Sequence, residues 1–284
     1  MVETVEIFEV GPRDGLQNEA RKIATDDKIA LVDLLSTVGF RRIEVASFVS
    51  PKWVPQMADS AQVLAGITRF PGISYAALTP NMRGFERAIA ANADEISVFG
   101  SASEGFSQAN VNCSISESLE RFKPILVAAR AEKIQVRGYV SCVTDCPFDG
   151  PTASEKVAEV AQALLDMGCY EISLGDTIGH ATPQTTRAML DAVCQSIPAE
   201  KLAGHFHDTK SRALENIETS LEFGLRVFDA AVGGLGGCPF APGAAGNVAT
   251  EIVHKRLKLL GYETGLSAKT LEQAAELAKS LRAN

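Results

Sequence analysis

Two of the chain's four histidines, His205 and His207, lie two residues apart at the end of a short apolar run. Residues two apart on a β-strand point to the same face, so the two imidazoles can share one cation. Asp14 would add a carboxylate and Asn247 an amide oxygen, and this mixed ligand set suits Mg2+ or Mn2+. A His-x-His pair can instead only hydrogen-bond its neighbours. Because histidines are few and acids follow other apolar runs, the sequence favours the metal site.

Arg13, Glu44 and Asp176 are further charged residues at predicted strand ends. An arginine beside an acid, such as Arg13 beside Asp14, usually forms only a salt bridge. A guanidinium fixed at a strand end can, however, stabilise an enolate oxygen that develops on a carbonyl group. Acids in such positions often only orient a basic residue, and for Glu44 we favour that supporting role over direct catalysis. Arg13, Glu44, Asp176 and His205 are therefore candidate catalytic residues.

Cys238 follows a segment rich in glycine, residues 233–237, which contains four glycines. Such a segment is flexible enough to close over a ligand, so Cys238 is a candidate catalytic thiol. The remaining cysteines are interpreted as core or helix residues, where cysteine acts as a small hydrophobe; they are Cys113, Cys142, Cys146, Cys169 and Cys194. Neither a zinc site nor a structural disulfide is expected from their spacing.

The elements that must position these residues alternate along the chain. Short β-branched runs are separated by longer stretches with helical apolar spacing, as at Leu31, Leu35 and Val38, which indicates βαβ units and a parallel sheet. The predicted strands are Val5–Val10, Arg42–Ser47, Ile73–Thr79, Glu95–Gly100, Gln135–Cys142, Glu171–Asp176, Leu202–His207 and Val227–Val232. In a (β/α)8 barrel the active site lies at the carboxyl ends of the strands, where the candidate residues fall.

The predicted architecture is a single (β/α)8 TIM barrel over residues 1–284 with an added C-terminal helical segment. No Gly-x-Gly-x-x-Gly follows the first strand, and no linker rich in Pro, Gly or Ser divides the chain, which disfavours a doubly wound sheet. Residues 247–260 are predicted to form the closing helix and residues 269–281 a further helix. Helix starts are predicted at Thr152 with Glu155, at Ser114 with Glu117, and at Thr182-Pro183.

Composition limits the classes of partner. Apolar residues make up 46% and charged residues 22% of the chain, which is typical of a globular protein with a large core. A net charge of −8 disfavours nucleic acid, which normally needs a basic face. No apolar run is long enough to span a bilayer, and the chain start lacks the pattern of a signal or transit peptide. We therefore expect a cytoplasmic protein that acts on small molecules.

Five motifs, in order and at barrel-consistent spacing, resemble the 3-hydroxy-3-methylglutaryl-CoA (HMG-CoA) lyase family over nearly the whole chain. They occupy residues 11–19 (Gly-Pro-Arg-Asp-Gly-Leu-Gln-Asn-Glu), 139–142, 173–179, 205–209 and 236–241. The resemblance implies divalent-metal-dependent cleavage of HMG-CoA to acetyl-CoA and acetoacetate. It also implies that Asp14, His205, His207 and Asn247 hold the metal.

The resemblance assigns roles to the other candidates. Arg13 is expected to neutralise charge on the thioester oxygen, and Asp176 and Glu44 to support acid–base chemistry. Cys238 is expected to lie on a mobile loop and to handle the proton at the acetyl carbon. Gln17 and Ser47 are assigned to cofactor binding, residues 101–110 to CoA, and the expected assembly is a homodimer that takes an acyl-CoA substrate.

Alternatives remain open at this point. One is a Claisen-condensing acyltransferase of the 2-isopropylmalate or homocitrate synthase type. Those enzymes typically read Arg-Asp-Gly-Glu-Gln, whereas Leu16 stands before Gln17 here, and they usually have an extra C-terminal domain. A related 3-hydroxyacyl-CoA as substrate and a non-catalytic acyl-CoA-binding barrel are the others. Lys210-Ser211-Arg212 departs from the lyase pattern after His-Asp-Thr, so the sequence leaves the identity of the acyl group open.

Overall fold

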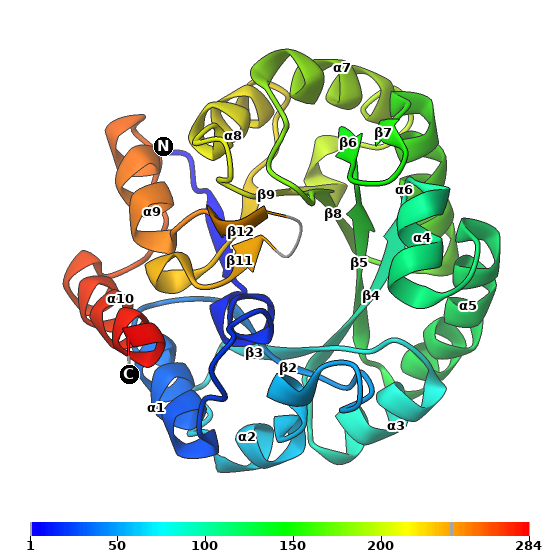
Figure 1. Ribbon diagram of the computed structural model, residues 1–284. Helices are drawn as coiled ribbons and strands as arrows, with labels where there is room; N and C mark the ends of the chain where they lie inside the picture. The colour runs from blue at the N-terminus through cyan, green and yellow to red at the C-terminus, as the bar shows by residue number, and fades with distance from the viewer. Residues whose placement is uncertain (1, 239–240, 284) are drawn as a thin grey trace.

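The chain folds as a closed barrel of parallel strands, as predicted (Figure 1). A computed structural model describes residues 2–238 and 241–283, without the side chains of residues 238, 241–245 and 283. The barrel strands are β1 (Glu6–Glu9), β2 (Arg42–Ser47), β3 (Ser74–Leu78), β4 (Glu95–Ser101), β5 (Gln135–Ser141), β8 (Glu171–Asp176), β9 (Leu202–Phe206) and β10 (Val227–Ala230). The largest difference from the predicted bounds is at β10, which ends at Ala230 rather than Val232. Pairing of β1 with both β2 and β10 closes the barrel.

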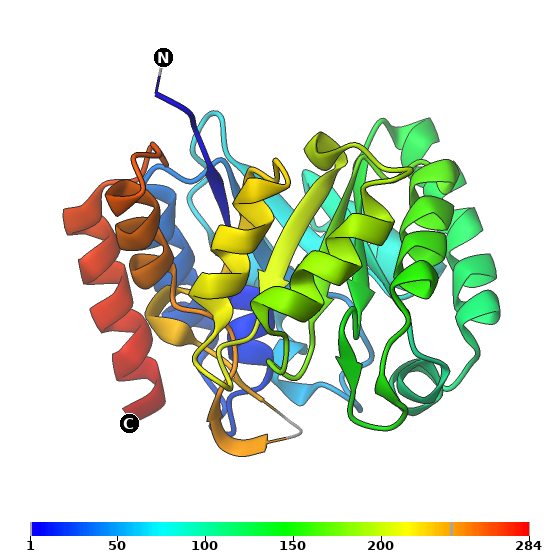
Figure 2. The same ribbon diagram turned by 90° about the horizontal axis from the view of Figure 1, so that it is seen from above.

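Helices surround the barrel and cover the outer face of its sheet, while closure of the barrel encloses the inner face (Figures 1 and 2). They are α1 (Thr25–Ser36), α2 (Ser60–Gly66), α3 (Met82–Ala90), α4 (Glu104–Val111), α5 (Ile115–Glu132), α6 (Ser154–Met167), α7 (Pro183–Val193), α8 (Ala213–Glu222), α9 (Thr250–Leu259) and α10 (Ala268–Ala283). The residues with helical apolar spacing, such as Leu31 and Leu35 of α1, are fully buried. Strands buried on both faces have near-continuous apolar runs, which explains the pattern in the sequence.

Two of the three predicted helix starts are confirmed. Ser114 forms a capping box with Glu117, and Thr182 caps α7 with Pro183 in the first turn. The prediction at Thr152 is wrong, because α6 begins at Ser154 after Ala153, without a side-chain cap. The backbone N–H of Thr152 instead donates to the carbonyl of Thr144, across the short hairpin that precedes α6.

The C-terminal helices are confirmed with one correction. α9 begins at Thr250, so Asn247 is not part of the closing helix as predicted. Asn247 instead forms an isolated bridge with His207, which places it at the barrel mouth. α10 lies over α1 and α9 at the outside of the barrel, and the described ends of the chain lie on opposite faces (Figure 2). None of the helices in the described ranges is both long and apolar enough to cross a membrane.

Several short structures at the carboxyl end of the barrel were not predicted from the sequence. They are a π-helix at Gly11–Gly15, the hairpin of β6 (Asp145–Cys146) with β7 (Gly150–Pro151), and the hairpin of β11 (Gly237–Cys238) with β12 (Ala241–Ala245). The π-helix begins directly after β1, and the carbonyl of Val10 accepts from the N–H groups of Arg13, Asp14 and Gly15. Such helices are rare and occur often at functional sites. The loop after β2 presents Trp53, which is 87% exposed.

Candidate active site

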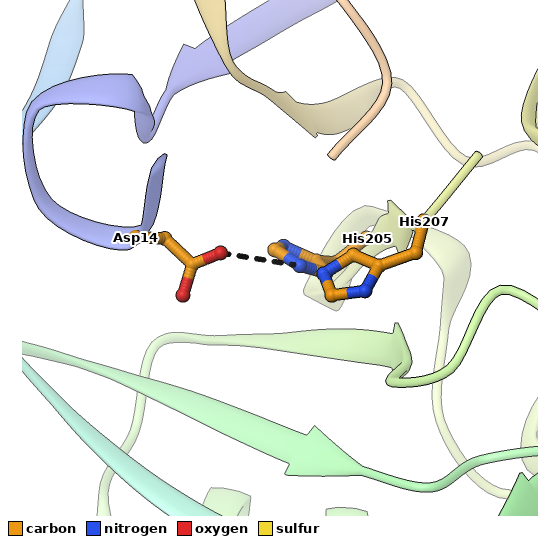
Figure 3. A group of neighbouring side chains, drawn as sticks. All are labelled: Asp14, His205 and His207. Carbon is orange, nitrogen blue, oxygen red and sulfur yellow. Dashed lines mark ion pairs between the residues drawn. The ribbon is translucent and has the colours of Figure 1, made fainter. Parts of the chain in front are cut away.

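Asp14, His205 and His207 converge at the barrel mouth (Figure 3). His205 lies in β9 and His207 just after it, so the strand's alternation turns both imidazoles to one side. Asp14 comes from the π-helix that follows β1. One ligand atom from each of the three residues lies within 4.8 Å of the others. Nε2 of His205 is 4.0 Å from Oδ2 of Asp14.

The electrostatics of this group suit a cation. Burial opposes ionisation of Asp14, but the adjacent charge of Arg13 outweighs it and lowers the pKa of Asp14 to about 2, so it is a carboxylate. Burial and the adjacent His205 lower the pKa of His207 to about 4, which keeps its imidazole neutral and able to act as a ligand. Nδ1 of His207 is buried and has no hydrogen-bond partner among the described residues. A carboxylate beside a neutral imidazole is a donor set that fits a divalent cation.

Asn247 lies beside this group. Its amide nitrogen donates to Oδ2 of Asp14 at 2.8 Å and more weakly to the carbonyl of Leu235 at 3.4 Å. The glycine at position 236 favours this approach. Its φ is +96°, and a Cβ there would lie 3.2 Å from the amide nitrogen of Asn247.

Arg13 is held between two carboxylates under the mouth. Its Nε donates to Glu44 at 2.5 Å and its Nη1 to Asp14 at 2.6 Å. Burial opposes its charge, but Glu44 and Asp14 outweigh that effect and raise the pKa of Arg13 above its ordinary value. Glu44 also accepts hydrogen bonds from Ser97 and from Tyr139, the latter at 3.2 Å. The carboxylate of Glu44 is therefore occupied in holding its neighbours.

Asp176 lies at the carboxyl end of β8 and is fully buried. It accepts backbone hydrogen bonds from His180 and Ala181, both at 3.1 Å. Burial outweighs these bonds and raises the pKa of Asp176 to about 6. A carboxyl group with that pKa can exchange a proton near neutral pH.

The other predicted residues are placed as follows. Gln17 and Ser47 each have a buried side-chain oxygen without a hydrogen-bond partner among the described residues. Cys238 ends β11, and its side chain lies outside the described residues.

The glycine segment before Cys238 (residues 233–237) is held at its base. Glu19 accepts from the N–H of Gly236 at 3.0 Å. Arg282 of α10 contacts Glu19 at 2.7 Å and donates to the carbonyls of Gly234 and Gly236 at 2.6 and 3.1 Å. Sequence reasoning gave no role to either Glu19 or Arg282.

Sequence reasoning also missed the charged residues inside the barrel, Arg137 of β5 and Asp229 of β10. Both are fully or almost fully buried, and Asp229 contacts His205. The available signal was a charged residue within an otherwise apolar strand, because such a residue needs a partner inside the protein.

Comparison with known proteins places these features in context. The sequence matches the family model described as HMGL-like over residues 4–278. It is 57% identical over 272 residues to the 3-hydroxy-3-isohexenylglutaryl-CoA/hydroxy-methylglutaryl-CoA lyase of Pseudomonas aeruginosa, a match that covers 96% of this chain and 91% of that protein. The crystal structure of the HMG-CoA lyase from Brucella melitensis is 59% identical, with a TM-score of 0.99 and coverage of 99% and 100%. An HMG-CoA lyase from Acinetobacter baumannii, in complex with coenzyme A and 3-methylmalate, is 40% identical, with a TM-score of 0.94 and coverage of 99% and 92%.

Proposed function

Because the chain belongs to the HMGL-like family of carbon–carbon lyases, we propose that it cleaves HMG-CoA to acetyl-CoA and acetoacetate with the help of a divalent cation. The family resemblance expected from the motifs is confirmed by these matches. Among the features of the site, the observation that carries the proposal is the group of Asp14, His205 and His207 directly beside a buried arginine. That combination suits a reaction in which negative charge builds up on two substrate oxygens. One is the tertiary hydroxyl oxygen, which the cation would polarise, and the other is the thioester oxygen, which Arg13 would neutralise.

Asp14, His205, His207 and Asn247 would hold the ion, either Mg2+ or Mn2+. When bound, the ion would polarise the tertiary hydroxyl of the substrate and a neighbouring oxygen. The mixed nitrogen and oxygen ligand set supports this choice of metals. Gln17 and Ser47 are proposed to contact the acyl-CoA through their unpartnered oxygens.

The reaction divides between the remaining residues. The C3 hydroxyl loses its proton, the C2–C3 bond breaks, and its electron pair passes to the enolate of acetyl-CoA. Asp176 supports loss of the hydroxyl proton, which its raised pKa of about 6 favours near neutral pH. Arg13 neutralises the developing charge on the thioester oxygen, and Glu44 holds Arg13 in position. Cys238 returns a proton to the acetyl carbon.

The direct test is incubation of the purified protein with HMG-CoA and Mg2+. We expect release of acetoacetate, its loss on chelation, and its recovery with added Mg2+ or Mn2+. Full activity in metal-stripped protein would refute the metal-dependent reaction. Release of CoA that depends on an added 2-oxo acid would instead identify a Claisen-condensing acyltransferase.

A larger substrate is the second candidate, because the name of the Pseudomonas aeruginosa relative includes 3-hydroxy-3-isohexenylglutaryl-CoA. Comparison of kcat/KM for the two acyl-CoA substrates decides between them.

The homodimer and the cytoplasmic location stay predictions. Sedimentation at several protein concentrations tests the homodimer, and imaging of the tagged protein in cells tests the location.

A further inference from the structure

Asp229 is a buried carboxylate directly behind His205. The two residues are register partners on the neighbouring strands β10 and β9, so their side chains lie next to each other inside the barrel. Oδ2 of Asp229 is 3.1 Å from Nδ1 of His205. Asp229 is 2% exposed and its side chain is fully buried.

The other contacts of Asp229 all come from hydrogen-bond donors. Arg137 donates through Nη1 to Oδ2 at 3.0 Å and through Nη2 to Oδ1 at 2.8 Å. The hydroxyl of Ser173 donates to Oδ2 at 2.7 Å. The buried guanidinium of Arg137 is the direct counter-charge of Asp229, which keeps Asp229 a carboxylate. A carboxylate only accepts, so the hydrogen between Asp229 and His205 belongs to Nδ1 of the histidine.

This assignment determines whether the other ring nitrogen of His205, Nε2, carries a hydrogen. In a neutral imidazole with its hydrogen on Nδ1, Nε2 has a free lone pair. Nε2 is the atom that faces Asp14, at 4.0 Å, inside the group that could hold a cation. Histidines that bind metals commonly donate their second N–H to a carboxylate, which fixes the tautomer and the ring orientation.

We propose that Asp229 is a positioning residue, which Arg137 and Ser173 hold in place, and that it keeps His205 in the tautomer whose Nε2 can bind the cation. The inference rests on the proposed metal-dependent function, but it concerns cation binding and not the cleavage step.

The test measures binding of Mn2+ alone, without substrate, to wild-type and Asp229→Asn protein. Arg137 needs an acceptor, so it should retain the amide oxygen of the substituted side chain. The amide nitrogen should then turn to His205 and force the hydrogen onto Nε2. The same exchange of carboxylate for amide gives the wrong histidine tautomer in serine proteases. We expect Mn2+ affinity to fall about 10- to 100-fold. Unchanged affinity in the folded variant would overturn the proposal.

A matched control is available at the surface. Asp145 contacts Nδ1 of His180 at 3.0 Å, a carboxylate–histidine pair outside the metal group. Asp145→Asn should leave Mn2+ affinity unchanged, and an equal loss in both variants would also overturn the proposal.

Asp229→Asn also leaves buried Arg137 without its full counter-charge and can therefore fail to fold. Nitrogen-15 NMR of labelled histidine in the wild-type protein is then decisive, because the chain has only four histidines. At a pH where His205 is neutral, we expect the hydrogen on Nδ1, and a hydrogen on Nε2 would overturn the proposal.

Ser173→Ala keeps the charge of Asp229 and should weaken Mn2+ binding by a few-fold. Wild-type protein that binds Mn2+ with this tautomer but does not cleave HMG-CoA would refute the proposed function alone.

Discussion

Arg13 shows how the site fixes a charge without exposing it. The guanidinium is 5% exposed and lies between Asp14 and Glu44 at hydrogen-bond distance from both. Because Asp14 and Glu44 are held in place by hydrogen bonds of their own, the guanidinium charge is fixed in one position. A charge fixed in advance stabilises a transition state without the cost of reorganising solvent.

Arg13→Met should therefore lower turnover far more than it weakens substrate binding. The expected loss in kcat is on the order of 100-fold or more, the scale for loss of one oxyanion donor. Steady-state kinetics separate kcat from KM, and Arg256→Met at the surface pair with Glu218 is the control. A change in KM alone would assign Arg13 to uniform substrate binding.

Cys238→Ser should fold normally and retain its metal but lose on the order of 100- to 10,000-fold in turnover, the usual range for a general acid or base. Serine has nearly the same size as cysteine but is far less acidic. Cys142→Ser is the control, because Cys142 is fully buried and burial raises the pKa of its thiol well above the ordinary value. If the Cys238 variant turned over normally, the proton donor would have to be another group.

Individual residues differ in how far the sequence could predict their place. His205 and His207 could be brought to one side from strand periodicity alone, and Asp14 from its position after a strand. Asp229 and Arg137 could not be paired in this way. Their contact depends on the register and tilt of strands that are far apart in sequence, which no local pattern contains.

At the scale of elements, α10 supports the mouth of the barrel. The glycine segment (residues 233–237) touches this helix through Arg282, which donates to Gly234 and Gly236 and contacts Glu19. The periodicity of α10 predicted a helix but not this function. The two mouth hairpins were not predicted either, because their strands are too short to show alternation.

Arg282→Ala should loosen the glycine segment without unfolding the barrel. Hydrogen bonds from a charged donor contribute about 1.5 kcal/mol, which corresponds to roughly tenfold faster amide exchange. Hydrogen–deuterium exchange of the peptide that includes residues 233–237 measures the effect, and Arg187→Ala at the outer pair with Glu222 is the control. Equal exchange in the two variants would show that Arg282 does not restrain the segment.

At the scale of the whole molecule, Glu9 joins three segments of the chain at one fully buried carboxyl group. It accepts from the N–H groups of Gly11 and Val232, at 2.8 and 2.9 Å, and from the hydroxyl of Thr250 at 2.7 Å. Burial outweighs these bonds and raises the pKa of Glu9 from 4.5 to about 7. As the pH rises, Glu9 therefore ionises in the unfolded chain before it ionises in the folded protein. The free energy of unfolding consequently falls between about pH 4.5 and pH 7.

Glu9→Gln should remove this pH dependence, because the amide stays neutral. Once Glu9 is fully ionised, its raised pKa corresponds to a loss of roughly 3 kcal/mol in the free energy of unfolding of the wild type. Relative to wild type, the variant should gain stability as the pH rises from about 5 to about 8, measured by urea unfolding at each pH. A difference between the two proteins that is constant with pH would contradict the raised pKa.

Trp53 is the only tryptophan in the chain, and it is 87% exposed in the loop after β2, at the carboxyl end of the barrel. The tryptophan fluorescence of the protein therefore comes from one indole ring at the carboxyl end of the barrel, and a ring so exposed emits at long wavelength. A ligand that covers this part of the rim would shift the emission to shorter wavelength. The protein thus has a single intrinsic tryptophan probe at the carboxyl end of its barrel, which can follow the arrival of such a ligand in real time without any label.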